Sequence, residues 1–163
     1  MKKIFLKLFA YAPLVFAAFT LFTLGACKKE KSPVEVPTTS ELICGNYWQL
    51  YSMPIEPPLD LIGGVKLTDY FTQTLNDCDK DNYVKYRDNN NLKTYVNYAG
   101  ILKCDPLDKD STIGVWSLSA DGKIIEQDGE KLKLILIDNK NMHIQMDNFM
   151  LNSSITFKFK KKI

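Results

Sequence analysis

Ile113–Ile137 reads IGVWSLSADGKIIEQDGEKLKLILI and carries the clearest fold signal in the chain. Apolar and polar residues alternate on both sides of its turns, and Leu132, Leu134 and Leu136 are expected on one face. Asp121-Gly122 and Asp128-Gly129 interrupt the alternation. An Asp-Gly pair between alternating segments is a strong hairpin signal, so this stretch predicts three consecutive antiparallel strands.

The same alternation continues on either side of this stretch. Further strands are expected at Tyr47–Met53, Asn82–Asp88, Leu92–Tyr98, Met142–Asp147 and Ile155–Phe159. The spacing of about 8–12 residues is typical of an all-β barrel or sandwich, and connections this short exclude parallel crossovers. We therefore expect an all-β, antiparallel, up-and-down eight-stranded barrel with short helices or none.

Two segments fit this pattern less well. Pro54–Gly64 is rich in proline and is expected to be the one long irregular stretch, either a lid or a connection. Leu67–Leu75 fits a strand or one short helix. Within the hairpin strand Leu92–Tyr98, the residues Leu92, Thr94, Val96 and Tyr98 share a face.

The N-terminal stretch has the order of a secretory signal peptide. A basic leader is followed by the apolar run Leu8–Leu24, in which Pro13 argues against a membrane-spanning helix. Leu24-Gly25-Ala26-Cys27 resembles the bacterial lipobox, in which the cysteine thiol receives a diacylglycerol. We therefore expect a signal peptide at residues 1–26, a lipid-modified Cys27 with a flexible tether at residues 27–40, and the barrel at residues 41–163.

Lipid attachment at Cys27 predicts a membrane partner and a place in the cell envelope. A processed lipoprotein carries at least two acyl chains, enough for stable anchoring. Lys28 follows the cysteine in place of the aspartate that retains lipoproteins in the inner membrane, which favours the outer membrane. Which side of the outer membrane the protein faces stays open.

The net charge of the chain without its leader is close to zero. When the leader lysines Lys2, Lys3 and Lys7 are left out, the chain has 18 basic and 19 acidic residues. This balance excludes a strongly basic nucleic-acid binder.

Four short segments together carry a family resemblance. They are Gly45-Asn-Tyr-Trp48, Cys78-Asp-Lys-Asp-Asn82, Lys103-Cys-Asp105 and Gly114-Val-Trp-Ser-Leu-Ser-Ala-Asp-Gly-Lys123. The chain resembles the lipocalin-like lipoproteins of the Bacteroidota over Leu42–Phe159. Two residues separate Gly45 from Trp48 where one is usual in the family. The resemblance implies a lipocalin-like barrel, and most of these relatives have no assigned activity.

The cysteines fit an oxidising compartment. With Cys27 blocked by lipid, three remain, and Cys78 and Cys104 flank one hairpin and match the two cysteines of the family pattern. The resemblance therefore implies that they pair, and closing a loop of about 26 residues contributes roughly 3–4 kcal/mol. Cys44 is then a free thiol. A metal site is disfavoured because the chain has no Cys-x-x-Cys and one histidine.

No catalytic constellation or cofactor motif is recognisable, so an enzyme is not expected and no cofactor is implied. Asp77, Asp79 and Asp81 resemble the start of a calcium loop, but the glutamate that such a loop needs is missing. We expect these acids to end a strand and cap a turn. Asp110-Ser111-Thr112 resembles the acceptor of Bacteroides-type O-glycosylation, which makes Ser111 a candidate modification site.

Aromatic residues make up 12% of the chain and either fill the barrel or line a cavity in it. We expect these side chains to fill the barrel. The candidate ligand-lining or core residues are Trp48, Leu50, Tyr86, Tyr98, Trp116 and Leu118. Two functions follow as hypotheses: a non-enzymatic binder of a small hydrophobic or envelope-derived ligand, and a filled barrel whose surface loops bind a partner protein or a glycan.

Overall fold

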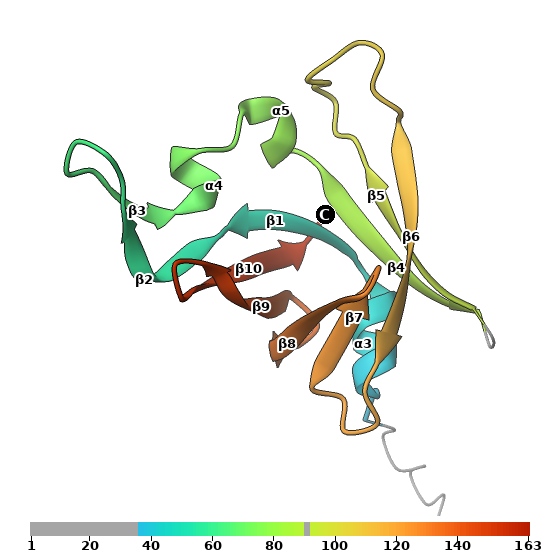
Figure 1. Cartoon of the computed structure of the whole chain (residues 1–163). Coiled ribbons are helices and arrows are strands. Elements are labelled where there is room, and N and C mark those ends of the chain that lie inside the picture. The colour runs from blue at the N-terminus through green and yellow to red at the C-terminus, as the bar shows by residue number, and fades with distance from the viewer. Residues whose placement is uncertain (1–35, 90–91) are drawn as a thin grey trace, which may run out of the picture. The chain divides into compact units, whose positions relative to one another are not determined.

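A computed structural model describes residues 36–89 and 92–163, and the compact unit Pro37–Ile163 is built mainly of antiparallel strands (Figure 1). Eight of them form a barrel: β1 (Tyr47–Ser52), β4 (Tyr83–Asn89), β5 (Leu92–Tyr98), β6 (Ser111–Leu118), β7 (Ile124–Gln127), β8 (Glu130–Ile137), β9 (Asn141–Met150) and β10 (Ser153–Lys161). The expected eight-stranded antiparallel barrel is confirmed, and each barrel strand overlaps a segment expected to be a strand.

The barrel closes because β1 pairs on both of its sides. The strands follow one another around the ring from β4 to β10, and β1 joins the two ends. Trp48 lies opposite Val84 on β4, and Leu50 lies opposite Phe159 on β10. A closed ring leaves these strands without the unpaired edges that promote aggregation.

Pro54–Gly64 is mostly a strand, so the prediction of an irregular stretch is wrong there. Pro54–Asp60 forms β2, which pairs with β3 (Lys66–Asp69) and with the first part of β10. Pro57 and Pro58 fall in an irregular part of the β2–β3 register, where a residue without an N–H loses no ladder bond. The alternating residues Ile55 and Leu59 are buried in a second apolar cluster.

Leu67–Leu75 contains both of the structures expected as alternatives. Strand β3 ends at Asp69, whose carboxylate accepts a hydrogen bond from the backbone N–H of Thr72 and caps helix α4 (Tyr70–Gln73). A second one-turn helix, α5 (Asp77–Lys80), precedes β4. In the described part of the chain no helix is long and apolar enough to cross a membrane.

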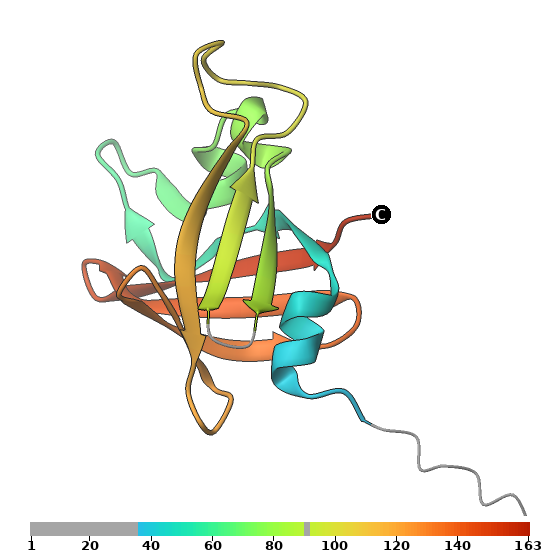
Figure 2. The same cartoon turned by 90° about the vertical axis from the view of Figure 1, so that its right-hand side faces the viewer.

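Helix α3 (Thr39–Gly45) covers the end of the barrel opposite the β5–β6 loop (Figure 2). It starts with a capping box, because Thr38 and Glu41 each hydrogen-bond the other's backbone N–H. Ile43, a residue of this helix, is fully buried, and its carbonyl accepts a hydrogen bond from the Trp48 indole N–H at 2.8 Å. The helix begins two residues before the expected domain boundary at Glu41.

The main core combines Ile43 of α3 with inward-facing residues from most barrel strands. Its buried members are Ile43, Trp48, Val84, Tyr86, Trp116, Ile125, Leu132, Met142 and Ile144. Strand β8 departs from strict alternation, because a bulge lies between Leu134 and Leu136. Ile137 therefore packs on the core, while Leu136 is 39% exposed, so the expectation that Leu136 shares the inner face is wrong.

Candidate functional site

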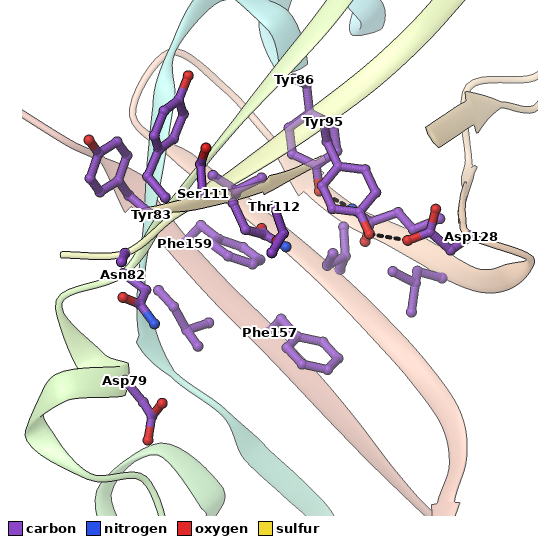
Figure 3. A pocket seen from close by; sticks show the side chains of 18 of the residues that line it. Asp79, Asn82, Tyr83, Tyr86, Tyr95, Ser111, Thr112, Asp128, Phe157 and Phe159 are labelled. Atoms are coloured by element: carbon purple, nitrogen blue, oxygen red, sulfur yellow. Dashed lines mark hydrogen bonds between the residues drawn. The ribbon is translucent and has the colours of Figure 1, made fainter. Parts of the chain in front are cut away.

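A cavity of about 890 Å³ lies within the barrel, on the side of α5 and the β5–β6 loop (Figure 3). Its lining includes residues of all eight barrel strands, β1 and β4–β10, but none of α3. The volume falls within the range of about 300–1,000 Å³ that small-molecule sites occupy. Side chains therefore fill the barrel at the α3 end only, and the expectation that they fill all of it is wrong.

One wall of the cavity is apolar and comes from β1, β8, β9 and β10. Its residues are Leu50, Leu132, Ile144, Met146, Phe157 and Phe159. Cross-strand pairs make this surface continuous, because Phe159 lies opposite Leu50 and Phe157 lies opposite Ile144. Such a surface suits hydrocarbon or the apolar face of a ring.

The opposite wall, from β4, β5 and β6, becomes polar towards the mouth. Asn97 on β5 lies between Val84 on β4 and Thr112 on β6, so all three share the inward face. Asn82, just before β4, also lines the cavity, and its side-chain oxygen accepts the N–H of Gly100. Neutral amide and hydroxyl groups therefore face the apolar wall across the cavity.

Tyr95 lies flat on β6 because Gly114 leaves room for it. The two residues are cross-strand partners, and a Cβ on Gly114 would overlap the tyrosine ring. The Tyr95 hydroxyl donates to Asp128, which also accepts the backbone N–H of Val115 at 2.9 Å. Burial, and then the bond to Asp128 and its charge, raise the pKa of Tyr95 to about 12. The hydrogen bond from Tyr95, and then the one from the Val115 N–H, lower the pKa of Asp128. At neutral pH, Tyr95 is therefore a neutral phenol and Asp128 a charged carboxylate.

Tyr86 is the most deeply buried polar group of the lining, with 1% of its surface exposed. Its hydroxyl accepts a hydrogen bond from the Gln127 side-chain nitrogen at 2.8 Å. Burial raises the pKa of Tyr86 above its ordinary value, so the hydroxyl keeps its proton. The hydroxyl therefore has a hydrogen-bond partner in the protein and also lines the cavity.

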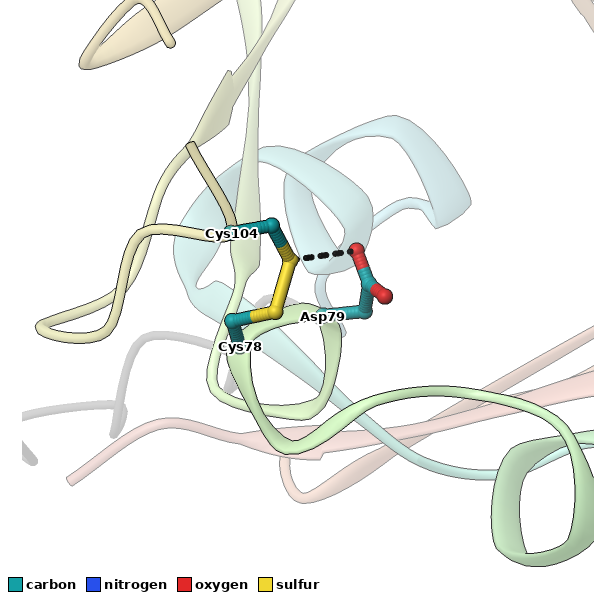
Figure 4. Close-up of side chains that lie close together, drawn as sticks. All are labelled: Cys78, Asp79 and Cys104. Atoms are coloured by element: carbon teal, nitrogen blue, oxygen red, sulfur yellow. Dashed lines mark hydrogen bonds between the residues drawn. A yellow bond between two sulfur atoms is a disulfide. The ribbon is translucent and has the colours of Figure 1, made fainter. Parts of the chain in front are cut away.

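A disulfide joins Cys78 on α5 to Cys104 in the β5–β6 loop, with their Cα atoms 5.2 Å apart (Figure 4). This agrees with the expected pairing. The bond connects the two segments that contribute Asp79, Asp108 and Lys109 to the cavity lining. It therefore restrains the cavity mouth, and Cys44 remains as a half-buried free thiol.

The acids around this disulfide serve different roles. Asp79 Oδ1 lies 3.4 Å from the Cys104 sulfur, but both sulfurs are used in the disulfide and offer no thiolate to a metal. Asp77 pairs with Lys80, and Asp81 accepts the backbone N–H of Leu102. Asp77 and Asp79 lie in α5, and Asp81 follows at its C-terminal end.

The six residues expected to line a ligand site or form core divide between these roles. Trp48 and Trp116 lie in the buried core, and Leu118 packs against it. Leu50 lines the cavity, and Tyr86 belongs both to the core and to the cavity lining. Tyr98 reaches the cavity rim, but its ring stacks on Tyr83 at 4.9 Å, and its hydroxyl accepts from Arg87 on the outer face.

Some functional positions were missed from the sequence. Asp128, Glu130 and Asp79 were assigned to turns, yet all three line the cavity. Asp128 does occupy the expected turn, with a positive φ of 48°, and its carboxylate also holds Tyr95. Ser111, the candidate for glycosylation, is the first residue of β6 and lies opposite Tyr98 at the cavity mouth.

Fold and site together define an all-β protein with a closed eight-stranded antiparallel barrel, a packed end and a cavity with one apolar and one polar wall. No protein-family model matches the chain, and no curated protein matches it significantly. The resemblance to lipocalin-like lipoproteins therefore stays a prediction from its motifs.

Proposed function

We propose that this protein is a non-enzymatic, lipocalin-like binder of a small amphipathic molecule. The observation that carries this proposal is the cavity, because its volume and its two unlike walls match the requirements of a bound ligand. Phe157 and Phe159 would contact the apolar part of the ligand. Asn97, Thr112 and the Tyr86 hydroxyl would bind its polar groups.

The competing hypothesis was a filled barrel that binds a partner through its surface. The cavity argues against the filled interior of that hypothesis. Loop residues near the cavity mouth do expose aliphatic side chains, such as Ile101 and Leu107 in the β5–β6 loop. Two exposed aliphatic side chains do not define the chemistry of a partner, and the cavity therefore supports ligand binding better.

We expect a neutral apolar probe, N-phenyl-1-naphthylamine, to bind the purified barrel domain with one molecule per chain. Asn97→Trp and Thr112→Trp should each weaken binding at least about tenfold, because an indole would occupy the space between the two walls. Fluorescence titration gives both the affinity and the stoichiometry.

Ile113→Trp is the matched control for these variants. Ile113 follows Thr112 on β6 but points outward and is 72% exposed, so the same added bulk should leave binding unchanged. Binding that is equal in all three variants, or that does not saturate at one molecule, would contradict a ligand site in the cavity.

We further propose that the protein is anchored to the outer membrane of the cell envelope through lipid on Cys27. The support is the lipobox-like Leu24–Cys27 motif, which lies outside the described residues, as does the expected signal peptide. In a Gram-negative host, Cys27→Ser should move the protein from the membrane fraction to the soluble fraction, because the acylated thiol is lost. Cys44→Ser is the control and should leave fractionation unchanged. Membrane association that survives Cys27→Ser would refute the anchor.

A further inference from the structure

The charges around the cavity are strongly one-sided. Four acids line it, Asp79, Asp108, Asp128 and Glu130, against the single lysine Lys109. The barrel domain expected at residues 41–163 has 15 basic and 17 acidic residues, so the three excess negative charges of the site exceed the domain's net charge of −2. Asp79 and Asp108 come from α5 and the β5–β6 loop, whereas Asp128 lies in the β7–β8 turn and Glu130 is the first residue of β8. Figure 3 shows Asp79 and Asp128 on different sides of the pocket.

The ion pairs of the described residues do not include these acids, although Lys103 lies beside Asp108 and donates to its backbone carbonyl. In the described segments 36–89 and 92–163, none of the four acids takes part in an ion pair, although Asp60, Asp77, Asp88, Asp110 and Asp147 all do. The hydrogen bond from Tyr95 holds the pKa of Asp128 below its usual value and keeps this carboxylate charged. A positively charged group in the mouth would therefore gain attraction, and a carboxylate or sulfate would be repelled.

The interior of the cavity is mainly apolar and sets the other part of the ligand. Phe157 and Phe159 on β10 line it together with Leu50, Ile144 and Met146. The most deeply buried polar group of the lining, the Tyr86 hydroxyl, already has a hydrogen-bond partner in the Gln127 side chain. Because covering apolar surface is favourable, an occupant with an apolar body fits this part of the cavity better than a purely polar one.

We infer that the ligand is an amphiphile with a cationic, amine-bearing head at the acidic mouth and an apolar body against Phe157 and Phe159. This inference rests on the proposed ligand-binding function and names the chemical class of the ligand. An anionic amphiphile such as a fatty acid has the same apolar body but the wrong sign of charge at the mouth.

The test compares three ligands that share one ten-carbon chain and differ only in the head: decylamine, decanol and decanoate. Each displaces N-phenyl-1-naphthylamine from the barrel domain at pH 7 and low ionic strength, below the micelle concentration. Decylamine should bind at least about tenfold more tightly than decanoate, with decanol between them. Raising the salt to physiological strength should reduce this ratio, because the acids at the mouth are partly exposed.

The double variant Asp79→Asn/Glu130→Gln should reduce the ratio of decylamine to decanoate affinity at least about threefold, with the affinity of each variant for uncharged decanol as the reference. Asp60→Asn is the matched control, since Asp60 is an exposed acid of β2 that does not line the cavity. Decanoate that binds as tightly as decylamine would overturn this inference while leaving the binding function intact. If the neutral probe and all three ligands fail to bind, the proposed function itself is contradicted.

Discussion

Replacing Trp48 with alanine is expected to lower the free energy of unfolding by about 3–5 kcal/mol, the usual cost of deleting a buried tryptophan. Trp48 has no exposed surface and packs with Val84, Trp116 and Ile43 in the main core. Its indole N–H also binds the carbonyl of Ile43, which fixes α3 over the end of the barrel. The variant therefore loses both a large apolar contact and the attachment of the helix.

Chemical denaturation followed by circular dichroism measures this loss. Trp48→Phe keeps most of the apolar contact but lacks the indole donor, so it should cost clearly less than alanine and remain folded. Ile113→Ala is the control, because Ile113 is 72% exposed on the outer face and its truncation should change stability by less than about 0.5 kcal/mol. A loss in Trp48→Ala no larger than that of the control would show that Trp48 is not part of a core.

The strands were predictable because alternation and turn chemistry are local properties. Asp121-Gly122 and Asp128-Gly129 have glycines with positive φ, as the hairpins around β7 require. Alternation alone does not predict which face of a strand points into the barrel. On β5, Leu92, Thr94, Val96 and Tyr98 do share a face, but the register with β4 turns Tyr95 and Asn97 into the barrel instead. Register depends on partner strands and cannot be read from one strand alone.

The cavity was harder to predict than the barrel. Its lining comes from residues between Leu50 and Phe159, and no short motif contains more than a few of them. The acids at the mouth also follow turn rules, so their sequence context explains them without any ligand. Gly114 is the most informative position in retrospect. A glycine inside an otherwise regular strand marks a close approach, here of the Tyr95 ring.

The two ends of the barrel have separate tasks. Near α3, large side chains such as Trp48 and Met142 interlock and supply stability. At the other end, smaller polar residues such as Asn97 and Thr112 face the phenylalanines across open space. The two regions meet inside the barrel, because Val84, Tyr86, Leu132 and Ile144 belong to the core and also line the cavity. Asn97 and Thr112 line the cavity but lie outside the core cluster, so substitutions there test binding with the least effect on stability.

Breaking the disulfide is expected to lower the free energy of unfolding by roughly 3–4 kcal/mol under oxidising conditions. The bond spans a sequence separation of 26 residues and encloses the β4–β5 hairpin, so its loss gives the unfolded chain more conformations. Cys78→Ser and Cys104→Ser should have equal effects, because either substitution removes the same bond. Thermal and denaturant unfolding, with and without a reducing agent, measure the difference.

Reductant should lower the stability of the wild-type protein to that of the two serine variants and leave the variants unchanged. Cys44→Ser is the control, because Cys44 is the free, half-buried thiol and contributes no cross-link. The bond also holds α5 against the β5–β6 loop, so the serine variants should bind the neutral probe more weakly as well as unfold more easily. Wild-type stability in both serine variants under oxidising conditions would mean that this bridge does not form in solution.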